Sequence, residues 1–93
     1  MVEIISYGNF DTIRKASGSP AVWYVFSNIA ASVVIDNLGT GDGYVNFDTA
    51  AGIGSTNLLI RDGRSIALDL RVGSVSILQS GTNTPDFQVV GLR

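Results

Sequence analysis

Alternation of apolar and polar residues is clearest between residues 57 and 78. Residues 65–71 alternate without interruption, and a period of two is typical of a strand with one buried face. A polar turn at residues 61–63 precedes this segment, residues 72–73 interrupt the pattern, and it resumes over residues 74–78. The stretch therefore predicts a strand, a corner and a second strand.

Similar patterns predict further short strands on both sides of this stretch. They lie at residues 2–7, 10–16, 32–38, 44–48, 58–60 and 87–92. Residues 21–26 are apolar on both faces, which suits a central strand or one whose outer face is covered. Glycine-rich residues 39–43 predict a hairpin between their two neighbouring strands, while residues 28–31 and 49–56 are predicted connections.

Seven or eight short strands with regular turns, and no helical period, predict an all-β fold. We expect one domain over residues 1–93, an antiparallel β-sandwich with jelly-roll or Greek-key connections, because a chain of this length must fold one sheet over another to bury two apolar faces. The predicted core consists of Val33, Ile35, Val45, Phe47, Ile66, Leu68, Leu70, Val75, Ile77, Phe87 and Val89.

Two residue types that carry much of enzyme chemistry are missing from the sequence. The chain contains no cysteine and no histidine. It therefore has neither a thiolate nucleophile nor an imidazole, the commonest general base and transition-metal ligand. We expect no catalytic residue, no metal site and no cofactor, and we expect the protein not to be an enzyme.

The charge pattern argues against two kinds of partner. The net charge is −2, from six Lys and Arg against eight Asp and Glu, so no basic surface is available for a nucleic-acid backbone. The longest apolar runs reach only about six residues, where a membrane span needs roughly 20. The N-terminal residues also lack the basic and apolar regions of a signal peptide. We expect neither nucleic acid nor membrane as a partner.

Low charge predicts association with other subunits. Charged residues make up 15% of the chain, whereas soluble domains average about 25%. We expect a homo-oligomer or a multi-copy lattice, with contacts on the outward side of residues 21–26 and on the flanking loops. The candidate interaction surface comprises Trp23, Tyr24, Tyr44, Ile53, Arg61 and Arg64.

Aspartates and aromatic residues leave two alternatives open. Four aspartates fall at strand ends or turns, where carboxylates can bind Ca²⁺ but are also favoured for turn formation, which is the interpretation we prefer. Trp23 or Tyr44 would suit a carbohydrate-binding module, although aromatics in strands more often belong to the core. The four aspartates are Asp36, Asp42, Asp48 and Asp62.

The order of motifs from residue 32 to the end resembles a known class of module. The motifs are SVVIDN at 32–37, YVNFD at 44–48, LIRDG at 59–63, SIALDL at 65–70, VSI at 75–77 and VVGLR at 89–93. This succession resembles the small β-sandwich modules in structural proteins of tailed bacteriophages. The resemblance implies a non-enzymatic virion component whose partners are capsid or neck proteins.

Overall fold

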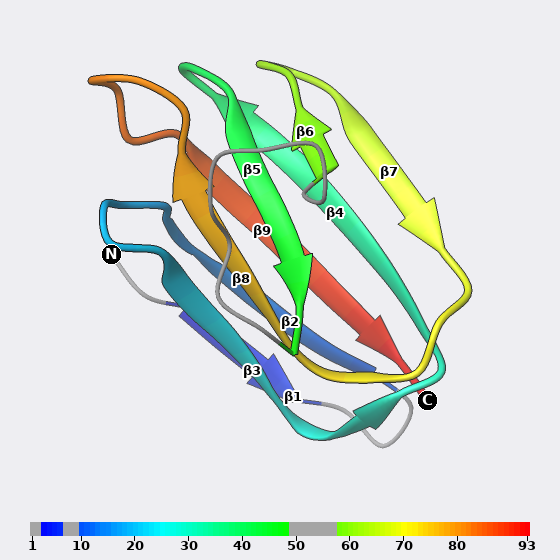
Figure 1. Cartoon of the computed structure of the whole chain (residues 1–93). Helices are drawn as coiled ribbons and strands as arrows, with labels where there is room; N and C mark the ends of the chain where they lie inside the picture. Colours follow the sequence, from blue (N-terminus) through cyan, green and yellow to red (C-terminus); the bar gives the residue numbers. More distant parts are fainter. Residues whose placement is uncertain (1–2, 7–9, 49–57) are drawn as a thin grey trace.

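The computed structural model describes residues 3–6, 10–48 and 58–93, and two antiparallel sheets pack face to face (Figure 1). Nine strands are described. They are β1 (Glu3–Ser6), β2 (Phe10–Ala16), β3 (Val22–Ala30), β4 (Ser32–Gly39), β5 (Gly43–Phe47), β6 (Leu58–Ile60), β7 (Ser65–Leu68), β8 (Val72–Gln79) and β9 (Asp86–Leu92).

The strand order is that of a jelly roll. One sheet has the order β1-β2-β9-β4-β7 and the other β3-β8-β5-β6. Among the described strands from β2 onward, only β5 and β6 follow one another within the same sheet, because every other connection crosses to the opposite layer. The crossing brings the apolar face of each strand between the layers. The predicted antiparallel β-sandwich is therefore confirmed.

The core lies between the two sheets. Its largest fully buried side chains include Tyr24 and Phe87, one from each layer. Of the predicted core, four side chains are only partly buried: Phe47, Ile66, Leu68 and Leu70. Ile66 and Leu68 lie on β7, which is the last strand of its sheet. The buried apolar residues are Ile13, Tyr24, Phe26, Ala30, Val33, Ile35, Val45, Ile60, Val72, Val75, Ile77, Phe87 and Val89.

The predicted hairpin between β4 and β5 is wrong. β4 pairs with β7 and β9, whereas β5 pairs with β6 and β8 in the other sheet. The glycine-rich connection between them therefore turns the chain from one layer to the other. Gly39 and Gly41 have φ angles of +87° and +113°, a backbone conformation that glycine adopts without a steric cost.

The predicted central strand at residues 21–26 is also corrected. β3 lies at the edge of its sheet and continues to Ala30, through residues predicted to be a connection. Tyr24 and Phe26 point into the core, while Trp23 and Val25 are 37% and 62% exposed. The strand is apolar on both faces although its outer face is exposed in the part of the chain that the structure describes.

The corner in the 57–78 stretch lies a few residues earlier than predicted. β7 ends at Leu68 and β8 already begins at Val72, so residues 69–71 form the connection. Val72 is buried and pairs with Ala30 of β3. Val72 therefore continues the strand although Gly73 follows it, because the Val72 side chain is buried in the core.

Tyr24 belongs to the core rather than to the surface. Its hydroxyl donates a hydrogen bond of 2.6 Å to the carbonyl oxygen of Lys15, and the Lys15 Nζ lies 5.2 Å from the ring centroid. Burial, with a contribution from the negative charge of Asp86, raises the pKa of the Tyr24 hydroxyl above its usual value.

No helix long and apolar enough for a membrane span occurs in the described residues.

Candidate functional site

Three connections meet at one end of the sandwich, the upper end in Figure 1. They join β4 to β5, β6 to β7 and β8 to β9. Between them lies a pocket of about 270 Å³, which we call the acidic pocket. Its lining residues are Thr40, Gly41, Asp42, Asp62, Ser80, Gly81, Thr82 and Asn83.

The carboxylate of Asp42 binds the connection between β6 and β7, and the carboxylate of Asp62 binds the connection between β4 and β5. The backbone N–H of Asp62 donates to Oδ1 of Asp42 at 2.9 Å, and that of Gly41 donates to Oδ2 of Asp62 at 3.1 Å. Each carboxylate thus uses one oxygen to hold a neighbouring turn. Within the described residues, neither carboxylate forms an ion pair or any other side-chain interaction. Each therefore keeps one oxygen for a ligand.

A buried asparagine supports this end of the sandwich from below. Asn37 of β4 is 3% exposed. Its Nδ2 donates to the carbonyl oxygens of Gly41 at 2.8 Å and Ile60 at 3.1 Å, while its Oδ1 accepts from the N–H of Gly39 at 2.9 Å. The backbone N–H of Asn37 also donates to the carbonyl oxygen of Arg64 at 2.9 Å. One residue therefore positions two of the three connections.

The acidic pocket is suited to a particular chemistry. Its side chains offer carboxylate, hydroxyl and amide groups, which accept hydrogen bonds and attract positive charge. A carboxylate there can also accept a proton from a bound molecule. The pocket, at about 270 Å³, lies just below the usual size range of ligand sites, about 300 to 1,000 Å³, so its ligand must be small.

A second pocket, also of about 270 Å³, lies beside the connection between β6 and β7. We call it the arginine pocket. Two guanidinium groups and apolar side chains from the edge strands of both sheets line it. The lining residues are Leu59, Ile60, Arg61, Arg64, Ser65 and Ile66.

The residues of the predicted interaction surface are spread over the molecule. Arg61 and Arg64 come together in the arginine pocket. Trp23 is on the outward face of β3, and Tyr44 is half-buried on β5, with β8 between these two strands. Tyr24 is buried. Ile53, like the predicted connection at 49–56, lies outside the described residues.

The sequence prediction did not identify the acidic pocket. Asp42 and Asp62 were expected chiefly to form turns, with Ca²⁺ binding as the alternative, and in the structure their carboxylates accept hydrogen bonds from the backbone of these turns. The signal for a shared site was their position beside glycines at strand ends. Because β4 and β5 were predicted to pair, the alignment of the three connections at one end was not foreseen.

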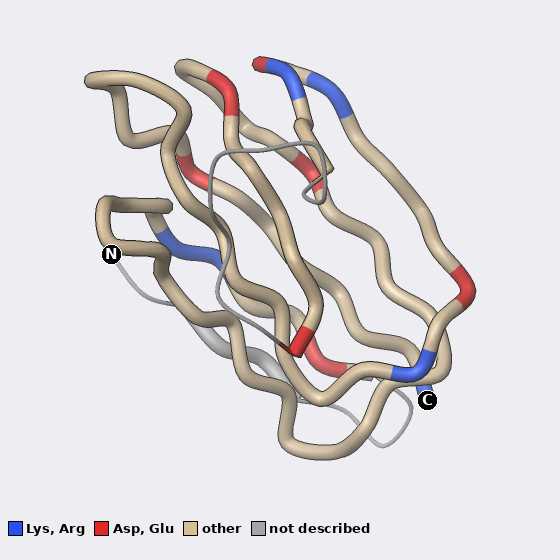
Figure 2. Tube along the Cα trace, in the orientation of Figure 1, with Lys and Arg blue, Asp and Glu red and all other residues tan. Residues whose placement is uncertain are grey.

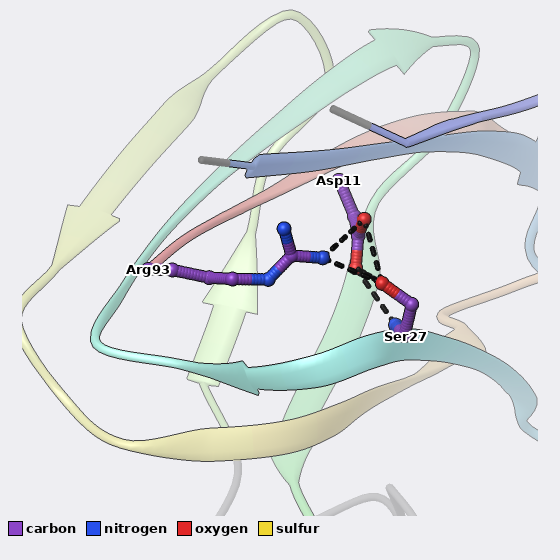
Figure 3. A network of polar contacts seen from close by, with 3 residues as sticks. All are labelled: Asp11, Ser27 and Arg93. Atoms are coloured by element: carbon purple, nitrogen blue, oxygen red, sulfur yellow. Dashed lines mark hydrogen bonds and ion pairs between the residues drawn. The ribbon is translucent and has the colours of Figure 1, made fainter. Parts of the chain in front are cut away.

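A polar network joins the two sheets at another edge (Figure 3). Asp11 of β2 is 2% exposed, and its carboxylate accepts hydrogen bonds from the N–H of Ser27 at 2.7 Å and from its hydroxyl at 2.8 Å. Arg93 Nη2 forms an ion pair of 2.8 Å with Asp11 and a hydrogen bond of 2.5 Å to the Ser27 Oγ. The network connects β2, β3 and the residue after β9.

The comparisons with solved structures find neighbours of the same fold, several of which are described as cupin proteins. A protein of Neisseria meningitidis has a TM-score of 0.60 and 18% identity over 100% of this chain and 83% of its own. A cupin domain of Bordetella pertussis has a TM-score of 0.61 and 10% identity over 100% and 92% of the two chains. Fe(II) HppE in complex with substrate has a TM-score of 0.64 and 11% identity over 99% and 53%.

No known protein family and no curated protein matches the sequence.

The Fe(II) of HppE prompts a test of the donor groups in this chain. The sequence has no histidine or cysteine, and no group of three or more candidate metal-ligating side chains occurs within the described residues. The described residues therefore do not fit an iron centre.

The comparisons correct the predicted virion component. The neighbours are mostly cupin-domain proteins and not phage modules, so the phage resemblance, the capsid-docking role and the virion location are wrong. None of these neighbours is described as a carbohydrate-binding module. Motifs such as YVNFD encode a strand and a turn, which unrelated jelly rolls share.

The expectation of a protein without enzymatic activity is also corrected, because HppE, whose structure was solved in complex with a substrate, has the same fold. The absence of histidine and cysteine excludes only mechanisms that require an imidazole or a thiolate, and carboxylates remain available for proton transfer. Identities of 10% to 18% establish the fold alone. The chain has the jelly-roll fold of cupin-domain proteins.

Proposed function

We propose that the protein binds a small organic cation, an alkylamine or a related ammonium compound, in the acidic pocket. The observation that carries this proposal is the pair of aspartates from two different connections that line one pocket. Three hydroxyl groups, from Thr40, Ser80 and Thr82, and the amide of Asn83 surround them. An ammonium group has three N–H donors and a positive charge, so it complements these acceptors.

The size and rigidity of the pocket support a ligand of a few non-hydrogen atoms. A volume of about 270 Å³ lies just below the range of small-molecule sites, about 300 to 1,000 Å³. The hydrogen bonds between Asp42, Asp62 and Gly41 hold the pocket walls before a ligand arrives. Less conformational entropy is then lost on binding.

The proposal is tested by NMR titration of the ¹⁵N-labelled protein with propylamine, and with propanol and propionate as neutral and anionic counterparts. We expect propylamine to shift the amide resonances of residues 40–42 and 80–83. Asp42→Asn and Asp62→Asn each retain an oxygen for the turn hydrogen bond but lose the charge. Each is expected to weaken propylamine binding by about fivefold.

Asp69→Asn provides the matched control, because Asp69 is an exposed aspartate in the connection between β7 and β8. It removes the same charge and should leave propylamine binding unchanged. Equal binding of propanol and propylamine would contradict the proposal. An equal effect of Asp69→Asn would also contradict it, as would saturable binding of Ca²⁺ without any binding of the amine.

We also propose that two copies associate through the edge of β3. The nine residues of β3 contain no charge, and this strand is tan along its length in Figure 2. Trp23, Val25 and Ile29 are 37%, 62% and 59% exposed. Edge strands are normally protected by charges, proline or a covering segment. An uncharged edge can pair with its own copy without electrostatic repulsion.

Light scattering coupled to size-exclusion chromatography over a concentration series tests this association. We expect a dimer or larger species whose population rises with concentration. Val25→Lys should weaken it by at least about tenfold, because it places like charges opposite one another in the paired edge. Ala67→Lys, at an exposed position on β7, should not. A monomer at every concentration would contradict the proposal.

A further inference from the structure

We propose that the arginine pocket is a second binding site, for a small oxyanion that carries an apolar group. The ligand class comprises short alkyl phosphates and alkyl carboxylates. Residues of the β6–β7 connection line both this site and the acidic pocket, but the two share no lining residue. The inference does not depend on the function proposed for the acidic pocket.

A tight turn brings the two guanidinium groups to one place. The N–H of Arg64 donates to the carbonyl oxygen of Arg61 at 3.0 Å, so these residues are the first and fourth of a β-turn. The Cα atoms at these positions lie within about 7 Å of one another. Gly63, the third residue, has a φ of +74°, as a type II turn requires. Both arginines consequently line the same pocket.

The positive charge of this pocket is not paired with a carboxylate within the described residues. No carboxylate lines the pocket, and within the described residues neither Arg61 nor Arg64 forms an ion pair or a side-chain hydrogen bond. Asp62 lies between them in the sequence, but its carboxylate accepts a hydrogen bond from Gly41 and lines the acidic pocket. The turn thus presents a carboxylate to one pocket and two guanidinium groups to the other.

The remaining lining explains why an apolar group is part of the ligand. Leu59 is 38% exposed on β6, and Ile66 is half-buried on β7. These strands end their respective sheets, so the apolar wall is formed by both layers. Guanidinium groups bind carboxylate and phosphate through paired hydrogen bonds. An alkyl group on the same molecule would cover the exposed leucine.

The arginine pocket is also held in place before binding. Asn37 of β4 bonds to both arms of the turn, through its Nδ2 to the carbonyl oxygen of Ile60 and through its backbone N–H to that of Arg64. Both contacts involve a residue that is 3% exposed. The backbone under the two arginines is therefore fixed, and only their side chains must be ordered by the ligand.

The test is an NMR titration of the ¹⁵N-labelled protein with butyl phosphate, butyrate, inorganic phosphate and butylamine. Butyl phosphate and butyrate should shift the amide resonances of residues 59–66, and comparison of their affinities identifies which oxyanion is preferred. Butylamine should leave these resonances unchanged. Arg61→Gln and Arg64→Gln should each weaken binding of the preferred anion by about tenfold.

Two control variants separate a specific site from general attraction. Arg71→Gln removes an exposed arginine from the connection between β7 and β8 and should change binding by less than about twofold. Leu59→Ser should weaken butyl phosphate by about threefold and leave inorganic phosphate unchanged. Circular dichroism of each variant confirms the fold.

Several outcomes would overturn the inference. The site is not selective for anions if butylamine shifts residues 59–66 as strongly as butyl phosphate does. The attraction is non-specific if Arg71→Gln has the same effect as the pocket variants. The apolar wall has no role if Leu59→Ser weakens both phosphates equally. Asp62→Asn distinguishes the two pockets, since it should weaken amine binding and not weaken anion binding.

Discussion

Replacing Asp11 by alanine is expected to lower the free energy of unfolding by about 3 kcal/mol. The carboxylate is 2% exposed and accepts hydrogen bonds from Ser27 and Arg93. Its removal leaves the N–H and hydroxyl of Ser27 and the Arg93 guanidinium without this acceptor in a partly closed site. Because domains of this kind are stable by about 5 to 15 kcal/mol, the loss is large. Urea denaturation followed by circular dichroism measures it.

Two further variants show whether the charge or only the contact of Asp11 matters. Asp11→Asn keeps one oxygen that can accept both hydrogen bonds from Ser27 but turns its NH₂ group toward Arg93 Nη2, so we expect a loss smaller than that of alanine and at least as large as that of Arg93→Gln. Arg93→Gln should cost about 1 kcal/mol, since the Arg93 side chain is 21% exposed and Asp11 keeps its bonds to Ser27. A loss below about 1 kcal/mol for Asp11→Ala would indicate that the network does not join the sheets energetically.

Replacing Asn37 by alanine is expected to destabilise the protein by about 3 kcal/mol and to weaken both pockets. The change removes three side-chain hydrogen bonds and leaves the carbonyl oxygens of Gly41 and Ile60 without their donor. The connections that carry Asp42 and Arg61 then lose their common support. Denaturation measures the stability, and titrations with propylamine and butyl phosphate measure the two affinities.

Asn28→Ala is the matched control for Asn37, because Asn28 is exposed on β3. It should change the unfolding free energy by less than about 0.5 kcal/mol. Asn37→Asp is expected to be at least as harmful as alanine, since a carboxylate would face two carbonyl oxygens. Full stability of Asn37→Ala with unchanged affinities would show that the turns are held by other contacts.

The strand pattern was largely determined by local sequence. Alternation placed Val33 and Ile35 of β4, and Val75 and Ile77 of β8, in the core, and the structure buries all four. A period of two decides which side chains share a face whatever the strand pairs with. The turn glycines followed from the same local reasoning, since a positive φ is cheap only for glycine.

Strand pairing and burial at the edges depended on the tertiary structure. The strands on both sides of the glycine-rich connection alternate in the same way whether they form a hairpin or lie in opposite sheets. The alternation therefore could not predict that β4 and β5 belong to different layers. Ile66 and Leu68 have a strong pattern but end a sheet and remain half-buried. Val72 and Ala30, in predicted breaks, pair with one another and are buried because both belong to the core between the sheets.

The candidate sites depended on long-range geometry even more strongly. Arg61 and Arg64 were identified from the sequence, and a local turn brings them together. The acidic pocket instead requires Asp42, Asp62 and Asn83, which come from three connections and meet only because the jelly roll brings these connections to one end. Local alternation determines the face of each residue, whereas the order of strands in the two sheets determines which turns are neighbours.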